Sequence, residues 1–105
     1  MPNMRVEFTA SAERDLRAIA LFIAMDNRSK AIEFTLELRA KAKALGEFPD
    51  RYAIVATVKG HVIRRRPAGN YLIYYIHFAD RISVLRIINA AVATDEFTQS
   101  LLGSP

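Results

Sequence analysis

Three consecutive arginines, Arg64, Arg65 and Arg66, are the most unusual group of side chains in the sequence that could carry chemistry. In a β-strand successive side chains point to opposite faces, so Arg64 and Arg66 should share one face and Arg65 should take the other. Guanidinium groups pair well with carboxylates and phosphates, which makes Arg64 and Arg66 candidate partner-binding residues. The alternative is that the three cations protect an edge strand against aggregation.

Arg86 is a second unusual residue, because it interrupts the apolar alternation of Ile82, Val84 and Ile88. A charge on a half-buried strand face normally needs a partner. We predict a structural role for Arg86, in which it forms a salt bridge or binds a carbonyl group. The alternative is that its side chain points into a functional groove.

The other residue types do not favour metal or covalent chemistry. The two histidines, His61 and His77, are not spaced as metal ligands. The four glycines are scattered, so they form no phosphate-binding loop. The absence of cysteine excludes a disulfide scaffold, a thiolate metal site and a cysteine nucleophile. We therefore predict no catalytic residue, no cofactor and no metal site.

The basic residues are concentrated in one part of the chain. The net charge is +4, from 15 basic and 11 acidic side chains. Residues 57–91 hold six basic residues against one acidic residue, Asp80, so the excess lies in this segment. Such a patch could face nucleic acid or an acidic protein, or it could be a solvated strand face that maintains solubility.

The hydrophobic pattern predicts an α+β fold in a single domain over residues 1–105. An N-terminal strand over residues 4–8 precedes two helices that form a hairpin. Thr9 or Ser11 should cap the first helix and Ser29 the second, while Gly46 should end the second. The apolar stripes are Leu16, Ile19, Ala20 and Ile23 on the first helix, and Ala31, Phe34, Leu38, Ala42 and Leu45 on the second.

The second half of the chain is predicted to form a three-stranded antiparallel meander. Its strands cover residues 61–66, 71–78 and 82–89, and the nearly continuous apolar run of the second favours a central position. Residues 54–58 could add a short strand within a connector, over residues 47–59, whose Phe48 and Tyr52 should pack on the core. A short C-terminal helix over residues 94–102, capped by Thr94, completes a two-layer sandwich.

Some apolar residues of the helical hairpin exceed what the core stripes require. Leu21 and Phe22 lie on the first helix, and Ile32 and Leu36 lie on the second. Exposed together, they would make an aggregation-prone patch unless a partner covered it. We predict that Leu21, Phe22, Ile32 and Leu36 bind a partner.

No apolar run approaches the roughly 18 residues that span a bilayer. Charged residues interrupt the N-terminal region, so we expect neither a signal peptide nor contact with a membrane. The expected location is the cytoplasm.

Four segments in order resemble the ParE branch of the RelE/ParE toxin superfamily. They are residues 12–19 (AERDLRAI), Phe48-Pro49, residues 69–75 (GNYLIYY) and residues 82–87 (ISVLRI). The resemblance covers nearly the whole chain and implies the toxin of a bacterial type II toxin–antitoxin pair. It also implies a small ParD-like antitoxin whose C-terminal part wraps the toxin.

Two activities are implied by the superfamily, namely inhibition of DNA gyrase by ParE-like toxins and ribosome-dependent mRNA cleavage by RelE-like toxins. RelE-like cleavage relies on basic side chains and a C-terminal tyrosine. Here Leu72 stands where an arginine is common, residues 89–93 are uncharged, and residues 94–102 contain no tyrosine. The resemblance therefore favours gyrase. The alternatives are an mRNA interferase, with His61 beside Arg64 and Arg66 as substitute groups, and a non-toxic partner-binding module.

Overall fold

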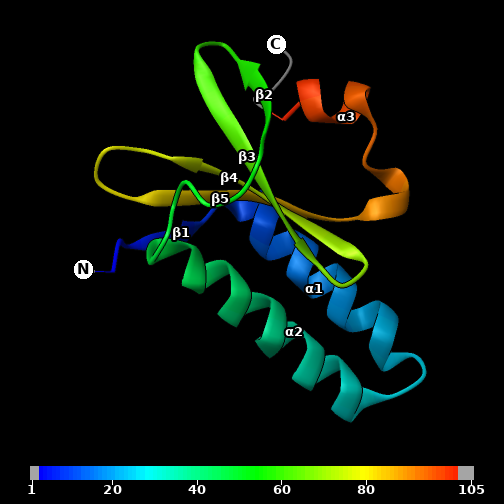
Figure 1. Ribbon diagram of the computed structural model, residues 1–105. Helices are drawn as coiled ribbons and strands as arrows, with labels where there is room; N and C mark the ends of the chain where they lie inside the picture. The colour runs from blue at the N-terminus through cyan, green and yellow to red at the C-terminus, as the bar shows by residue number, and fades with distance from the viewer. Residues whose placement is uncertain (1–2, 102–105) are drawn as a thin grey trace.

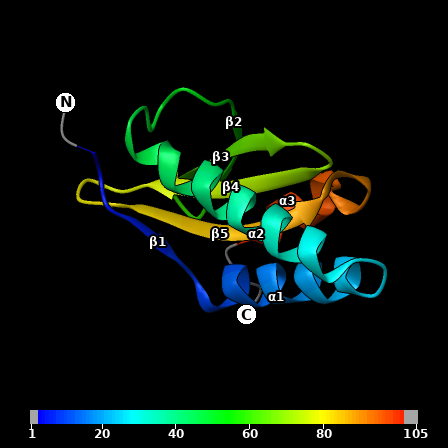
Figure 2. The same cartoon turned by 90° about the horizontal axis from the view of Figure 1, so that it is seen from below.

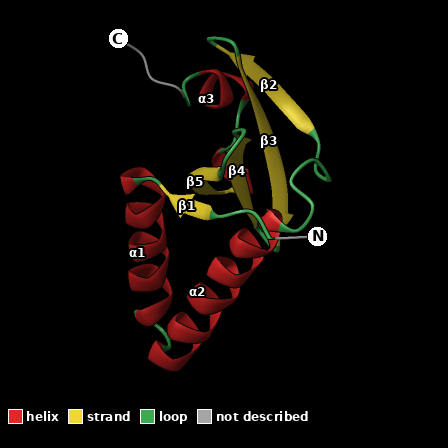
Figure 3. Cartoon of the chain, turned by 90° about the vertical axis from the view of Figure 1, so that its left-hand side faces the viewer, coloured by secondary structure: helices red, strands yellow, loops and turns green. Residues whose placement is uncertain are grey.

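The computed structural model describes residues 3–101 and has two helices packed on one face of a five-stranded sheet and a short helix on the other (Figures 1 and 3). This α+β arrangement confirms the predicted fold class. The helices are α1 (Ala10–Ala24), α2 (Arg28–Lys43) and α3 (Asp95–Gln99), and the strands are β1 (Val6–Phe8), β2 (Ile54–Val58), β3 (His61–Ala68), β4 (Tyr71–His77) and β5 (Ile82–Asn89). Short 3-10 turns occupy Ala44–Gly46 and Ala90–Val92. Residue 102 of the predicted final helix lies outside the described residues.

The sheet has the strand order β1-β5-β4-β3-β2, with β1 parallel to β5 and all other pairs antiparallel. The meander therefore has four strands rather than three, because the short strand at residues 54–58 pairs with β3. This pairing covers β3 on its second side at Arg64, and the Arg65 amide donates to the Ala53 carbonyl, so the edge-protection interpretation was wrong for these two residues. Arg66 lies beyond the part of β3 that pairs with β2. The central position predicted for β4 is confirmed.

A β-bulge in β5 changes the face assignment made from the sequence. Tyr74 pairs with Arg86, but the next residue, Tyr75, pairs with Val84, so β5 has one extra residue at this point. A one-residue shift moves every later side chain to the opposite face. Val84 and Ile87 consequently pack in the core under the helices, while Ile88 packs in the cluster on the other face. The simple alternation Ile82, Val84, Ile88 was therefore wrong.

The N-terminus of α1 is joined to the edge of β5 beyond the end of β1. Thr9 caps α1, as predicted, because its hydroxyl accepts a hydrogen bond from the Ala12 amide at 3.1 Å. The same hydroxyl donates to the Leu85 carbonyl at 2.9 Å. One residue thus starts the helix and satisfies a strand edge.

The cap of α2 differs from the prediction. Asn27 has an extended backbone, and its side-chain oxygen accepts from the Lys30 amide at 3.0 Å. Ser29 lies inside the first helical turn, which excludes it from the N-cap position. Asparagine and serine are about equally favourable at the N-cap position, so residue type alone could not show whether Asn27 or Ser29 caps α2.

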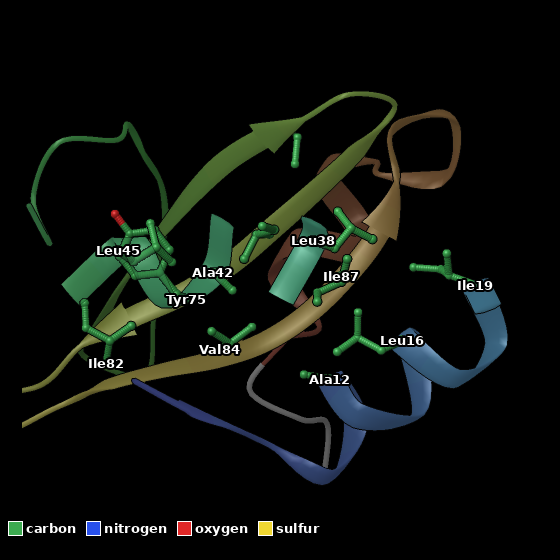
Figure 4. Packing of buried hydrophobic residues seen from close by; sticks show 12 residues of the cluster. Ala12, Leu16, Ile19, Leu38, Ala42, Leu45, Tyr75, Ile82, Val84 and Ile87 are labelled. Atoms are coloured by element: carbon green, nitrogen blue, oxygen red, sulfur yellow. The ribbon is translucent and has the colours of Figure 1, made fainter. Parts of the chain in front are cut away.

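The main core lies between the helical hairpin and the sheet, the two layers seen from below in Figure 2, and Figure 4 shows its side chains. Leu16, Leu38 and Tyr75 are among its buried residues. At one end of the core the backbone of Gly46 packs directly against the backbone of Met4. A Cβ atom on residue 46 would lie 2.3 Å from the Met4 carbonyl oxygen, so only glycine fits there. Tyr52 packs against the core as predicted, but Phe48 is 61% exposed, which contradicts the prediction for that residue.

A second apolar cluster lies on the opposite face of the sheet, under α3. Its buried residues are Ala56, Ile63, Tyr74, Ile76 and Ile88, and Phe97 of α3 packs against them. The Thr94 hydroxyl accepts from the Phe97 amide at 3.0 Å, which is the predicted cap. Within residues 3–101 the structure contains no helix with the length and hydropathy of a membrane span.

Candidate partner-binding surface

The four apolar residues predicted to face a partner are all highly exposed. The exposed fractions are 72% for Leu21, 70% for Phe22, 63% for Ile32 and 62% for Leu36. Met25, 83% exposed, extends the set and was missed because it falls in the turn after the helical stripe. We call these five residues the hairpin surface. Each helix directs one apolar stripe to the sheet, and the five residues lie outside these stripes.

Two grooves flank α1 and give the hairpin surface its shape. The seam groove, of about 210 Å³, runs between α1 and α2, and its lining includes Ala20, Ala24, Ala31, Leu21 and Ile32. The sheet groove, of about 230 Å³, lies between α1 and the end of β5. Small alanine side chains in a groove flanked by large apolar ones fit the apolar face of an amphipathic helix.

The sheet groove brings Phe22 close to a second exposed apolar residue. Its lining includes Phe22, Ile88, Tyr71 and Val92, and Val92 is 59% exposed. Val92 lies in the 3-10 turn after β5, 70 residues after Phe22 in the chain, so periodicity within one helix could not reveal it.

Arg86 binds Asp15 at the border of the sheet groove. The Arg86 Nε–Asp15 Oδ2 distance is 2.8 Å and the Nη2–Oδ1 distance is 3.0 Å. Asp15 also accepts the Ile87 amide at 2.8 Å, a strand-edge donor that β1 does not reach. The hydrogen bonds that Arg86 donates to Asp15 raise the pKa of Arg86 above its ordinary value. The salt bridge predicted for Arg86 is therefore present.

Arg64 and Arg66 lie on the opposite face from Arg65, as the strand alternation predicted. Arg64 Nη1 donates to the Tyr52 carbonyl at 2.8 Å, and Arg66 Nη1 donates to the Lys41 carbonyl at 2.7 Å. Arg65 instead lies over the Tyr74 ring, 5.9 Å from its centroid. Arg64 and Arg66 thus fasten the connector and the end of α2 to the sheet, and their role in partner binding stays a prediction.

These contacts alter the stability effect expected for the arginine run. The strand pattern alone predicts that Arg64→Ala or Arg66→Ala weakens partner binding with little change in melting temperature. The carbonyl contacts predict that each change also lowers the free energy of unfolding, by about 1.5–3 kcal/mol, because a hydrogen bond from a charged group is lost. Arg65→Ala is the matched control and should lower the free energy of unfolding by less than Arg64→Ala or Arg66→Ala. Urea denaturation measures this, and equal losses in all three variants would contradict the face assignment.

His77 and Asp50 form a further attachment of the connector. His77 Nδ1 lies 2.8 Å from Asp50 Oδ1, and Arg64 Nε lies 3.5 Å from the same oxygen. The hydrogen bond from His77, aided by the charges of His77 and Arg64, lowers the pKa of Asp50. The Tyr75 hydroxyl donates to the Pro49 carbonyl at 2.7 Å, and burial raises the pKa of Tyr75 to about 12. Three sheet residues thus hold the connector.

We expect the Asp50 attachment to fail in acid. A carboxyl group whose pKa is lower in the folded state stabilises the fold above its unfolded pKa, and this contribution disappears as the pH falls through the folded pKa. Asp50→Asn should therefore be less stable than the unaltered chain at neutral pH, and the difference should shrink as the pH falls below the ordinary aspartate value of 3.8 and vanish below the lower pKa of the folded state. Urea midpoints across pH 2–7 measure it, and a difference that persists in acid would contradict this role.

Internal ion pairs account for much of the predicted basic patch. Arg81 Nε lies 3.0 Å from Glu7, and Arg64 and Arg86 pair with Asp50 and Asp15. Within residues 3–101, no group of three or more His, Asp or Glu side chains could hold a metal ion. The described surface is therefore suited to protein contact through its apolar residues more than through a cationic field.

The comparisons with known proteins agree with this geometry. The family model for the ParE toxin of the type II toxin–antitoxin system parDE matches residues 6–92. A chain of the chromosomal ParDE toxin–antitoxin system from P. aeruginosa is similar in structure, with a TM-score of 0.69 and 21% identity over 82% of this chain and 95% of that one. A chain of the toxin–antitoxin complex RelBE2 from Mycobacterium tuberculosis has a TM-score of 0.51 and 22% identity over 84% and 99%. None of the curated proteins matches the sequence significantly.

Proposed function

The chain belongs to the ParE family of type II toxin–antitoxin toxins, and we propose that it inhibits DNA gyrase and is neutralised by a cognate ParD-like antitoxin. The observation that carries the antitoxin half is the hairpin surface, whose five apolar residues are all highly exposed. Leu21 and Ile32 line the seam groove, and Phe22 lines the sheet groove. An apolar surface of this kind on a small protein is typical of a site that a partner covers. The two similar structures come from systems named as toxin–antitoxin pairs, which supports the same proposal.

The antitoxin segment that fits this surface is an amphipathic helix. Its apolar face would lie along the seam groove, between Leu21 and Ile32, where alanines allow close approach. A following extended segment could continue past Phe22 into the sheet groove towards Val92. Both grooves border α1, so one continuous segment can occupy them.

Gyrase is favoured over the ribosome because the residues that could replace RelE-like catalytic groups lie apart. His61 packs against Phe78, with ring centroids 5.7 Å apart, and Phe78 belongs to the apolar cluster under α3. Arg64 and Arg66 lie on the other face, bound to carbonyl groups. Leu72 packs in the same cluster as Phe78. A base and paired cations acting on one phosphate are needed for cleavage, and this arrangement does not provide them.

The test is to add the purified toxin in parallel to a gyrase supercoiling reaction and to translating ribosomes. We expect inhibited supercoiling with trapped gyrase–DNA complexes, and no cleavage in the ribosomal A site by toe-printing. Cleavage that His61→Ala or the Arg64→Ala/Arg66→Ala double variant abolishes would establish the mRNA interferase instead. Inactivity in both assays, with antitoxin binding retained, would indicate a non-toxic partner-binding module. A gyrase inhibitor acts in the cytoplasm, which is the location we propose.

A further inference from the structure

The short helix α3 is held in place by contacts with the second face of the sheet (Figure 1). A five-residue helix has no stability of its own in water, so these contacts keep it ordered. Phe97 meets the Tyr74 ring edge-on at 5.7 Å, and Thr98 is 5% exposed. Arg86 lies over the Phe97 ring, with its Cζ atom 5.5 Å from the ring centroid.

Beneath α3, three strands align two arginines on either side of a tyrosine. Arg65 of β3 pairs with Tyr74 of β4, and Tyr74 pairs with Arg86 of β5. The bulge in β5 brings Arg86 into this row. We call Arg65, Tyr74 and Arg86 the covered row. Arg65 is in contact with the Tyr74 ring, while Asp15 holds Arg86 from the edge.

The Tyr74 hydroxyl is buried and has no hydrogen-bond partner among the described residues. Its neighbour Tyr75 is equally buried, yet the Tyr75 hydroxyl donates to Pro49. A buried hydroxyl without a partner destabilises the state that buries it, because water would satisfy the group once exposed. Phenylalanine would fill the same space without this penalty. The penalty therefore weighs against the state in which α3 is docked.

We propose that α3 is a displaceable cover, that the unpartnered Tyr74 hydroxyl promotes its opening, and that the toxin opens it to engage its target. Opening pairs the Tyr74 hydroxyl with water and exposes the Tyr74 ring with its surrounding apolar cluster, between Arg65 and Arg86, which are only partly buried in the docked state. Phe97 and Leu101 leave this cluster together, because both belong to the last described segment of the chain. The helices α1 and α2 lie on the opposite side of the sheet from α3 (Figure 3), so an antitoxin helix could bind in the seam groove between them without displacing α3. The target half of this proposal rests on the proposed function.

Hydrogen exchange of the toxin alone tests the cover. The Thr98 amide donates to Thr94 at 2.9 Å and reports the opening of α3. Tyr74→Phe should slow exchange at Thr98 by about tenfold, because the docked state loses an unsatisfied group. Tyr75→Phe is the matched control and should not slow it. Phe97→Leu should speed exchange. Unchanged or faster exchange in Tyr74→Phe, or equal slowing in Tyr75→Phe, would overturn the proposal.

Gyrase inhibition by the same variants tests whether opening serves the target. If only the open toxin binds, Tyr74→Phe should require about tenfold more protein for half-inhibition, in proportion to its smaller open population. Unchanged potency despite slowed exchange would overturn the target half. A wild-type chain that does not inhibit gyrase would instead contradict the proposed function, while the exchange experiment would still decide whether α3 is a cover.

Discussion

Asp15→Ala is expected to destabilise the fold more than Arg86→Ala, although the two residues form one ion pair. Asp15 accepts two hydrogen bonds from Arg86 and one from the Ile87 amide. Removing Asp15 leaves both a guanidinium and a strand-edge amide without their acceptor, which should lower the free energy of unfolding by about 3–5 kcal/mol. Removing Arg86 leaves Asp15 still bound to the Ile87 amide, so the expected loss is only about 1–3 kcal/mol.

Urea denaturation of both single variants and the double variant measures the two costs and their coupling. The Glu13–Arg39 pair is a suitable control, since it also joins two oxygens to one guanidinium but is more exposed. Replacing Glu13 or Arg39 with alanine should lower the free energy of unfolding by about 1 kcal/mol or less. Equal costs for Asp15→Ala and Arg86→Ala would contradict the role given to the Ile87 amide. Full stability of Arg86→Ala with lost toxicity would place Arg86 in the functional site.

The features of the fold that depend on local sequence were predictable. The stripe containing Leu16 and Ile19 faces the core, Thr9 caps α1, and the continuous apolar run of β4 is central. Each of these features depends only on residues that are close together in the sequence, so the spacing of residue types is enough to predict it. The alternation within the arginine run is of the same kind, because it needs only the strand and its period.

The features that depend on pairing between strands were not predictable. The extra residue in β5 becomes visible only when β5 is paired with β4, and no residue type at that position predicts a bulge. The orphan hydroxyl of Tyr74 and the satisfied one of Tyr75 also look identical in sequence. The Asp15–Arg86 contact joins residues 71 positions apart. An unpaired charge in an apolar strand predicted that a partner exists without indicating which residue it is.

The candidate surface was partly predictable for the same reason. Leu21, Phe22, Ile32 and Leu36 exceed the number of apolar residues that one helical stripe can bury, and this surplus is visible in the sequence. The two grooves are not, because they require α1 to lie beside both α2 and the end of β5. Which of the exposed apolar residues matter most to a partner therefore follows only from the structure.

Phe22→Asp is expected to lower the affinity for the cognate antitoxin by at least about a hundredfold. Phe22 is 70% exposed, and it lines the sheet groove while Leu21, next to it, lines the seam groove. Large side chains at the centre of an interface commonly contribute 2 kcal/mol or more when truncated, and a carboxylate there would also be buried without a partner. Ile32→Asp on the other side of the seam groove should have a similar effect. The fold should be retained, because both side chains project away from the core.

Phe48→Asp provides the matched control for this prediction. Phe48 is also a highly exposed phenylalanine, at 61%, but it lies in the connector outside the hairpin surface. Titration calorimetry with the antitoxin encoded beside the toxin gene measures the affinities, and ultracentrifugation of the free variants measures self-association. We expect Phe22→Asp and Ile32→Asp to reduce both antitoxin binding and self-association, while Phe48→Asp leaves antitoxin binding unchanged. If Phe48→Asp alone weakened binding, the antitoxin would contact the connector, and the hairpin surface would have to serve another partner.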